Sequence, residues 1–243
     1  MTELYRRPGL AVYEKSHYSH MEHIHEVEQI LTWYRERETN VLDIGCSGGL
    51  HALEFAKRGF SVTGLDIEPS AIEIARKRKH NENIKARFYV IDIENDELSG
   101  LGKFNFIYSI GNVLSHVNRE HFLEILQKIQ GCLDDKGIFL FDLLINEQPF
   151  QEEIYPDDND LQIIWNRKID EKTGRIGMDG TFLESGFKQH FDVWGYKIDE
   201  IIGMLNSMGF RIIDFSEKLD FNEKNKTKNP ISLYFRVKLE GKV

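Results

Sequence analysis

The chain has 243 residues, of which 41% are hydrophobic and 29% charged, and its formal net charge at pH 7 is −9. These proportions are typical of a globular protein that buries one sizeable core, and the acidic balance argues against binding to the phosphate backbone of nucleic acid. Two distant cysteines, Cys46 and Cys132, do not form the pattern of a secreted protein stapled by disulfides. We therefore predict a cytoplasmic protein without a nucleic-acid partner.

No stretch of the sequence has the features of a membrane or signal segment. The first twenty residues, "MTELYRRPGLAVYEKSHYSH", contain no apolar run followed by a cleavage site. The most apolar stretch, "GIFLFDLLI" at Gly137–Ile145, contains an aspartate and is too short to span a bilayer. We expect no membrane partner. The sequence leaves the oligomeric state open, a homodimer included.

Residues 1–40 are predicted to be mainly helical, and we interpret them as a lid over the site. Apolar side chains recur there at the spacing of one helix face, at Ile24, Val27, Ile30, Leu31 and Tyr34. Residues 41–145 then alternate between predicted strands (41–44, 61–65, 86–91, 105–110, 137–143) and predicted helices (51–57, 70–80, 119–130). This alternation indicates an α/β fold, with a parallel sheet covered by helices on both faces.

The remaining sequence predicts two further parts of the same single domain. Residues 146–195 contain β-like runs around a Thr-Gly turn and are typical of an inserted antiparallel β-ribbon, which we place on the substrate side. Residues 196–243 predict one amphipathic helix and two closing strands, "RIIDFSE" and "ISLYFRVKL".

A glycine-rich turn follows the first predicted strand, in "VLDIGCSGGLHALEFAKRGFSVTGLD" from Val41 to Asp66. The stretch is typical of a nucleotide-binding βαβ unit, in which NAD and FAD require the pattern G-x-G-x-x-G. Counted from Gly45, the second and third glycines of that pattern would be Ser47 and Leu50. This mismatch argues against a dinucleotide cofactor and a nicotinamide-dependent dehydrogenase.

The pattern that fits instead is Asp-x-Gly-x-x-x-Gly, and it resembles motif I of the class I S-adenosylmethionine-dependent methyltransferases. Ser47 stands where that family usually has its middle glycine. The resemblance implies a Rossmann-like seven-stranded mixed sheet, with the aminocarboxypropyl arm of the cofactor lying across a turn that allows close backbone approach. It assigns five residues to cofactor binding: Asp43, Gly45, Cys46, Ser47 and Gly49. An ordinary tight turn is the alternative.

A carboxylate follows each of the next two predicted strands. Asp66 lies 21 residues after Gly45, where a carboxylate can accept hydrogen bonds from both ribose hydroxyls. The resemblance implies that Asp92 meets the adenine amino group and that the amide of Ile93 reads the ring edge; we add Ile67, next to Asp66, to the predicted cofactor contacts. A turn-capping role is the alternative for each aspartate.

The segment "FNFIYSIGNVLSHV", Phe104–Val117, resembles the corresponding segment of small-molecule N-methyltransferases such as the glycine and sarcosine methylases. In that family the residues matching Ile110 and His116 touch the cofactor, and those matching Gly111 and Asn112 border the reaction site. The alternative makes Asn112 a helix cap and His116 an interior histidine.

The resemblance predicts transfer of a methyl group from S-adenosylmethionine to a small molecule, at nitrogen, with S-adenosylhomocysteine as the product. Such a transfer mainly requires that the acceptor be held in line with the methyl group. We name His116 and Asn112 as candidate catalytic residues, with His116 as base or orienter because a histidine titrates near neutral pH. A cofactor-binding or structural role is the alternative for His116.

Candidate substrate contacts are Tyr13 and Tyr18 in the lid and Trp165, Arg167 and His190 in the ribbon, with plain packing or an exposed charge as the alternative for each. The spacing of His17, His20, His23 and His25 is poor for zinc, so we predict no metal. A non-catalytic binding protein that keeps the fold remains a second hypothesis, because Ser47 departs from the motif. The motif of nucleic-acid amino-methylases, Asn/Asp-Pro-Pro-aromatic, is absent after the fourth predicted strand.

Overall fold

The computed structural model describes residues 22–36, 39–82, 84–146, 153–155, 163–170, 172–183, 186–222 and 231–241. Its strands are β1 (Asn40–Ile44), β2 (Ser61–Asp66), β3 (Ala86–Val90), β4 (Phe104–Ser109), β5 (Leu133–Ile145), β6 (Glu153–Tyr155), β7 (Ile163–Asp170), β8 (Arg175–Phe182), β9 (Lys188–Tyr196), β10 (Phe210–Ser216) and β11 (Ser232–Leu239). Its α-helices are α2 (Glu22–Trp33), α3 (Leu50–Lys57), α4 (Pro69–Glu82), α5 (Phe122–Cys132) and α6 (Ile198–Ser207). Three 3₁₀ helices, η2 (Ser99–Leu101), η3 (Val113–Ser115) and η4 (Arg119–His121), lie in the connections.

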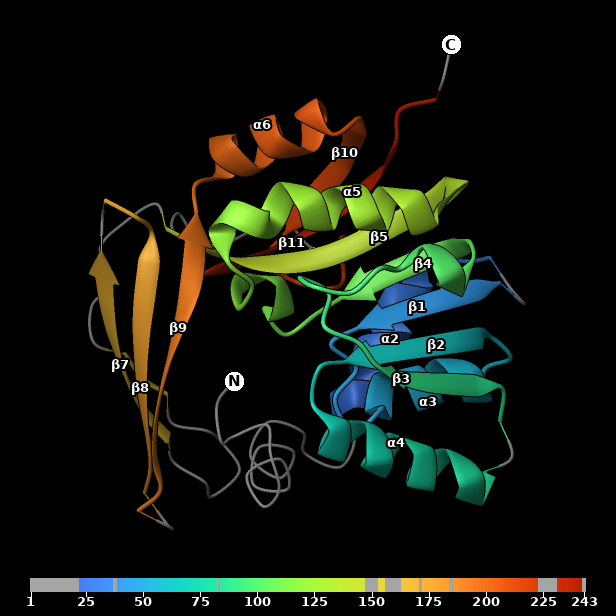
Figure 1. The fold of residues 1–243 in the computed structure, drawn as a ribbon, viewed down its shortest axis with the longest axis horizontal. Coiled ribbons are helices and arrows are strands. Elements are labelled where there is room, and N and C mark those ends of the chain that lie inside the picture. The colour runs from blue at the N-terminus through green and yellow to red at the C-terminus, as the bar shows by residue number, and fades with distance from the viewer. Residues whose placement is uncertain are drawn as a thin grey trace.

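Seven strands form the predicted mixed sheet (Figure 1). The order β3-β2-β1-β4-β5 is parallel, β11 pairs antiparallel with β5, and β10 pairs antiparallel with β11. The central strands are apolar runs whose side chains are buried on both faces, as expected of parallel strands between two helical layers. The α/β fold predicted from the alternation of strands and helices is therefore confirmed.

The ribbon extends the sheet to eleven strands. In the ribbon, β6 pairs with β7, β7 with β8 and β8 with β9, each pair antiparallel. β9 then pairs parallel with β5 at Leu144 and Ile145. β11 occupies one edge of β5 at Leu144, so β9 must take the other edge, beyond the point where β4 ends at Ser109. The ribbon consequently stands at the carboxyl ends of the parallel strands (Figure 1, left).

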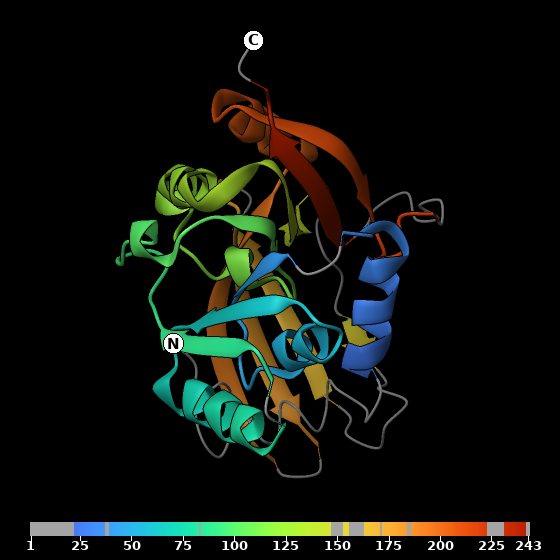
Figure 2. The same ribbon diagram turned by 90° about the vertical axis from the view of Figure 1, so that its right-hand side faces the viewer.

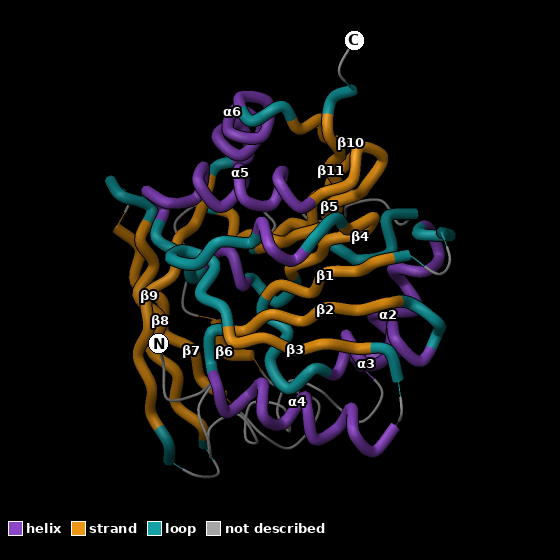
Figure 3. Tube along the Cα trace, turned by 45° about the vertical axis from the view of Figure 1, so that its right-hand side comes forward, coloured by secondary structure: helices purple, strands orange, loops and turns teal. Residues whose placement is uncertain are grey.

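Helices cover both faces of the sheet. On one face, α5 and α6 bury Phe122, Ile125 and Leu205 in a cluster with side chains of β4, β5 and β11. On the other face, α2, α3 and α4 bury apolar side chains such as Phe55 and Ile72 against β1 and β2. Figure 3 shows these two layers on either side of the strands.

The described part of the predicted lid does not cover the site. α2 packs beside α3 on a face of the sheet, where it buries Val27 and Ile30 (Figures 2 and 3). The apolar side chains of α2 are buried by that packing and do not face the site. Residues 1–21 of the predicted lid lie outside the described residues. None of the helices described is long and apolar enough to cross a membrane.

Candidate functional site

A cavity of about 630 Å³ lies where β1, β2, β3 and β4 end, with β9 of the ribbon as its opposite wall. This is the edge at which open α/β sheets bind ligands. The predicted residues that line it are Gly45, Ser47, Asp66, Ile67, Asp92, Ile93, Ile110, Gly111, His116 and His190. Motifs from five separate stretches of sequence thus meet in one space.

The turn after β1 is held in a conformation that suits glycine. Gly45 and Gly49 have φ angles of +81° and +80°, and Ser47 also has a positive φ, of +48°. A Cβ on Gly45 would lie 2.6 Å from both Cγ atoms of Val113, and one on Gly49 would lie 2.9 Å from Cβ of Ala75. Close packing against neighbouring elements therefore requires these glycines, in addition to any approach by a cofactor.

Asp43 and Cys46, which the resemblance assigns to the cofactor, are instead buried beside this turn. Asp43 is only 4% exposed, and burial raises its pKa to about 7, although nearby His51 and a hydrogen bond from Tyr108 act in the opposite direction. Cys46 is buried, and its Sγ lies 2.9 Å from where a Cβ on Gly64 would be. Neither residue lines the cavity, and Gly49 does not line it either.

Asp66 connects the turn to the end of β2. Its Oδ2 accepts a hydrogen bond from the amide of Ser47 at 2.8 Å, and its Oδ1 accepts one from the amide of Glu68 at 2.8 Å. Burial raises the pKa of Asp66, and hydrogen bonds from the amides of Glu68, Ser47 and Ile67 partly offset that effect. A carboxylate has about four acceptor positions, so about one remains for a ligand hydroxyl.

Asp92 both caps a turn and lines the cavity. Its Oδ1 accepts a hydrogen bond from the amide of Glu94 at 2.9 Å, and its Oδ2 accepts one from the side-chain amide of Asn95 at 2.8 Å. The two alternatives weighed for this residue are therefore compatible, because the turn holds the carboxylate at the cavity wall.

The loop after β4 is clamped by an aspartate that the sequence analysis missed. The amides of Gly111 and Asn112 donate to the two carboxylate oxygens of Asp142, at 3.2 and 2.8 Å. Asp142 lies on β5 and is 2% exposed, and burial raises its pKa to about 7. Its only sequence signal is a lone acid within the apolar run "GIFLFDLLI".

Asn112 itself points away from the cavity. Its Oδ1 accepts a hydrogen bond from the hydroxyl of Ser232 on β11 at 2.9 Å, and its φ angle is +57°. Asn112 occupies the N-cap position of η3, as the helix-cap alternative expects, but its side chain makes no capping hydrogen bond there. The residue shapes the loop that carries Gly111 and His116.

Comparisons with known proteins agree with this geometry. Residues 41–137 match the model of a family described as a methyltransferase domain. The match covers the part of the chain that carries the predicted cofactor motifs. A putative methyltransferase from Geobacillus sp. (strain WCH70) is 23% identical over 216 residues, which cover 84% of this chain and 86% of that protein. The O-antigen chain terminator bifunctional methyltransferase/kinase WbdD of Escherichia coli is 28% identical over 131 residues, 53% of this chain but only 18% of that longer protein.

The fold is also similar to that of solved methyltransferase structures. The crystal structure of an S-adenosylmethionine-dependent methyltransferase from Clostridium acetobutylicum ATCC 824 superposes with a TM-score of 0.75 at 18% identity, covering 96% of this chain and 98% of that one. Together these comparisons identify a methyltransferase with the fold of the S-adenosylmethionine-dependent enzymes.

His116 of the methyltransferase lies in the cavity as a neutral ring. Desolvation within the cavity lowers its pKa to about 4, although the residue is exposed. Its ring centroid lies 5.2 Å from that of Phe191, which joins the loop after β4 to the ribbon. At neutral pH this ring is a weak base, so of its two predicted roles the geometry favours the orienting one.

The other predicted substrate contacts are not all brought to the cavity. His190 lines it, whereas Arg167 on β7 does not. Trp165 also lies on β7, but its side chain, like the whole of Tyr13 and Tyr18, lies outside the described residues. His23 packs its ring edge-on against His51, with centroids 6.3 Å apart. Within the described ranges, no three His, Cys, Asp or Glu side chains are grouped to hold a metal ion.

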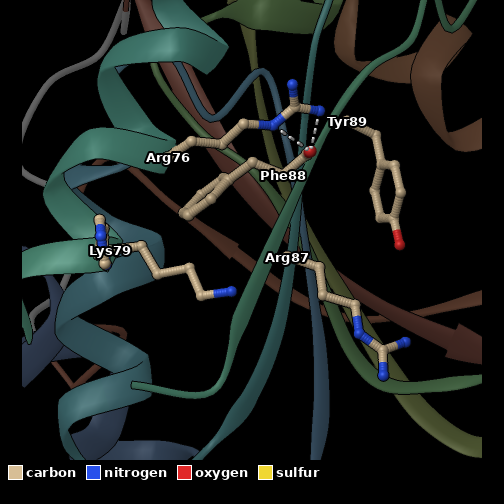
Figure 4. A pocket seen from close by; sticks show the side chains of 6 residues that line it. Arg76, Lys79, Arg87, Phe88 and Tyr89 are labelled. Atoms are coloured by element: carbon tan, nitrogen blue, oxygen red, sulfur yellow. Dashed lines mark hydrogen bonds between the residues drawn. The ribbon is translucent and has the colours of Figure 1, made fainter. Parts of the chain in front are cut away.

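A second hollow of about 400 Å³ lies apart from the strand ends, between α4 and β3. Arg76 is fixed there by donating from Nε and Nη2 to the carbonyl oxygen of Phe88, at 3.1 and 2.7 Å (Figure 4). Lys79 and Arg87 reach into the same open space from the helix and the strand. No residue of the predicted site lines this hollow, so we assign the methyltransferase site to the larger cavity.

Proposed function

We propose that this methyltransferase takes its methyl group from S-adenosylmethionine and transfers it to a small-molecule acceptor at nitrogen, with S-adenosylhomocysteine as the product. The observation that carries the proposal is the single cavity in which the turn after β1, Asp66 and Asp92 meet the loop after β4. Its volume of about 630 Å³ lies within the range of about 300–1,000 Å³ that is typical of small-molecule sites.

The polar groups of the cavity fit the cofactor. Asp66 keeps an acceptor position for a ribose hydroxyl, and Asp92 and Ile93 line the part of the cavity where the adenine would lie. The hydroxyl of Ser47 is buried without a hydrogen-bond partner among the described residues, as expected of a group that awaits a polar ligand. When bound, the cofactor supplies a methyl group on a sulfonium, which is already activated for displacement.

The protein's part in the reaction is then to position the acceptor. We assign His116 an orienting role through its neutral ring, and Asn112 the role of fixing the loop that carries it. The closer resemblance to the glycine and sarcosine N-methyltransferases, the cytoplasmic location and the absence of a nucleic-acid partner remain predictions.

The experiment that tests the proposal is a calorimetric titration of the purified chain with S-adenosylhomocysteine. Asp66→Ala is expected to weaken binding more than about tenfold, or about 1.4 kcal/mol, because it removes the proposed ribose acceptor. Asp134→Asn is the matched control, since Asp134 lies at the start of β5, where it accepts a hydrogen bond from the amide of Lys136 and does not line the cavity. Failure of the wild-type chain to bind would refute the proposal, and binding without transfer to any amine, hydroxyl or carboxylate would favour the non-catalytic alternative.

A further inference from the structure

The ribbon pairs a histidine that lines the cavity with an aspartate on the neighbouring strand. β8 and β9 are antiparallel with Asp179 directly opposite His190, so both side chains lie on the same face of the ribbon. Nδ1 of His190 lies 2.8 Å from Oδ1 of Asp179, while the His190 ring lines the cavity opposite the strand ends. The sequence separates the two residues by a turn, and only the register of the strands joins them.

This pairing determines which nitrogen of the ring can act as a base. An ionised carboxylate only accepts hydrogen bonds, so Nδ1 of His190 carries the proton that it donates to Asp179. Nε2 is then left with its lone pair, 3.9 Å from Oδ1 of Asp192. At that distance Asp192 is not a hydrogen-bond partner of Nε2.

The charges around the cavity favour a cationic acceptor. The acidic side chains that line it are Asp66, Asp92, Glu94 and Asp192, and no lysine or arginine of the described residues lines it. Arg175 on β8 pairs with the far oxygen of Asp192, outside the lining. A carboxylate or phosphate acceptor would meet repulsion here, whereas a protonated amine would be attracted.

Resting on the proposed methyl transfer, we propose that His190 is the general base for a primary or secondary amine that enters as a cation, and that Asp179 is its positioning residue. Nε2 of His190 takes one proton from the ammonium group, which frees the nitrogen lone pair. That lone pair forms the N–C bond to the methyl carbon while the C–S bond breaks and its electron pair stays on sulfur. The imidazolium then returns its proton to water.

Of the two histidines that line the cavity, His190 is the one suited to this step. Desolvation inside the cavity lowers the pKa of His116 to about 4, although this residue too is exposed; His190 in addition has Asp179 to fix its tautomer. The His190 side chain is 58% exposed, so a proton taken from the acceptor can pass on to solvent. We therefore assign the two histidines different roles: His116 orients the acceptor, and His190 accepts its proton.

The test is transfer of radiolabelled methyl from S-adenosylmethionine to three defined panels: small primary and secondary amines, small carboxylates, and phenols with other hydroxyl compounds. The wild-type chain is expected to methylate members of the amine panel. His190→Gln should lower kcat/KM for those amines about a hundredfold or more, within the usual contribution of a general base. Its Kd for S-adenosylhomocysteine should stay within about twofold of wild type.

The pH profile separates a base from a residue that merely shapes the ribbon. The wild-type kcat/KM should fall on the acid side as His190 becomes protonated, and His190→Gln should lose that limb. Asp179→Asn should lower kcat for amines while KM stays close to wild type, because an amide can donate to Nδ1 and so favours the wrong tautomer of His190. The matched control is His80→Gln, at an exposed position of α4 outside the cavity, and it should behave as wild type.

Each contrary outcome identifies what fails. Methylation confined to carboxylates or hydroxyls, no methylation of any amine, or a wild-type pH profile in His190→Gln would overturn this inference, even if S-adenosylhomocysteine still bound. Failure of the wild-type chain to bind S-adenosylhomocysteine would instead overturn the proposed function, and this inference with it.

Discussion

At the scale of single residues, Gly45 and Val113 bring the first turn of the site and the loop after β4 into contact. Gly45→Ala would place a Cβ 2.6 Å from the Cγ atoms of Val113 at a φ angle of +81°. We expect the free energy of unfolding, measured with urea, to fall by about 2–4 kcal/mol from backbone strain and overpacking together. Gly111→Ala is the matched control, because its φ is +88° with nothing within 4 Å of a Cβ.

A double variant separates the two effects at Gly45. Adding Val113→Ala to Gly45→Ala should recover the part of the loss that is due to overpacking, which a double-mutant cycle measures. Equal losses in Gly45→Ala and Gly111→Ala would show that the Val113 contact has no energetic weight.

Asp142 is a residue whose ionisation should be visible in the stability of the whole chain. Burial raises its pKa to about 7, above the unfolded value of about 3.9. The folded state therefore holds the proton more tightly, so the stability from this group is complete below about pH 4 and is lost as pH rises through 7.

Asp142→Asn should remove that dependence. Between pH 4 and 7 the slope of unfolding free energy against pH should change by at most about 1.4 kcal/mol per pH unit relative to wild type. Denaturant unfolding at several pH values provides the measurement. Asp43→Asn serves as a comparison, since the pKa of Asp43 is also raised to about 7. An unchanged slope in Asp142→Asn would contradict the burial argument.

At the scale of elements, Arg119 in η4 joins the core to the ribbon and to α6. Its Nη1 donates to the carbonyl oxygen of Gly195 at 3.0 Å, its Nη2 pairs with Glu200, and its guanidinium lies 4.9 Å from the centroid of the Tyr196 ring. β9 pairs with β5 through only two residue pairs, Leu144–Gly195 and Ile145–Tyr196. The orientation of the ribbon over the cavity therefore depends on contacts such as these.

Arg119→Ala is expected to loosen the ribbon more than the rest of the sheet. We expect about 1.5–3 kcal/mol of local stability to be lost, because hydrogen bonds to a charged group are removed. Hydrogen–deuterium exchange should rise in β9 and stay unchanged in β1 and β2. Arg211→Ala, at an exposed position of β10, should leave both regions unchanged. Uniform exchange across the sheet after Arg119→Ala would refute a specific role in holding the ribbon.

At the scale of the whole molecule, ligand binding should stabilise the sheet together with both helical layers. The strand ends that line the cavity belong to the same sheet that both apolar clusters cover. S-adenosylhomocysteine at a hundred times its Kd should add about 2.7 kcal/mol of stability. For a chain of this size, that corresponds to a Tm increase of about 5–11 °C in a thermal unfolding experiment.

NAD and NADP are the controls for this measurement, because the glycine spacing after β1 does not fit a dinucleotide. Neither should shift the Tm. A shift with a nicotinamide cofactor and none with S-adenosylhomocysteine would reverse the assignment of the cavity.

The sequence by itself determined the order of the elements and most of one wall of the site. The turn at Gly45, the carboxylates of Asp66 and Asp92, and Gly111 each follow a predicted strand. The carboxyl ends of parallel strands meet at one edge of a sheet, so local patterns predicted a shared location before any contact was known. The seven-stranded sheet came from the resemblance of these motifs to a family.

The tertiary structure decided everything that depends on contacts between distant segments. Asp142 clamps the loop after β4 only because β5 lies beside it, and α2 is satisfied by packing on α3 instead of covering the cavity. The loop after β4 brings His116 to the cavity wall, and strand register places Asp179 opposite His190. Burial and register are properties of the assembled sheet, so no local pattern of residues could have specified them.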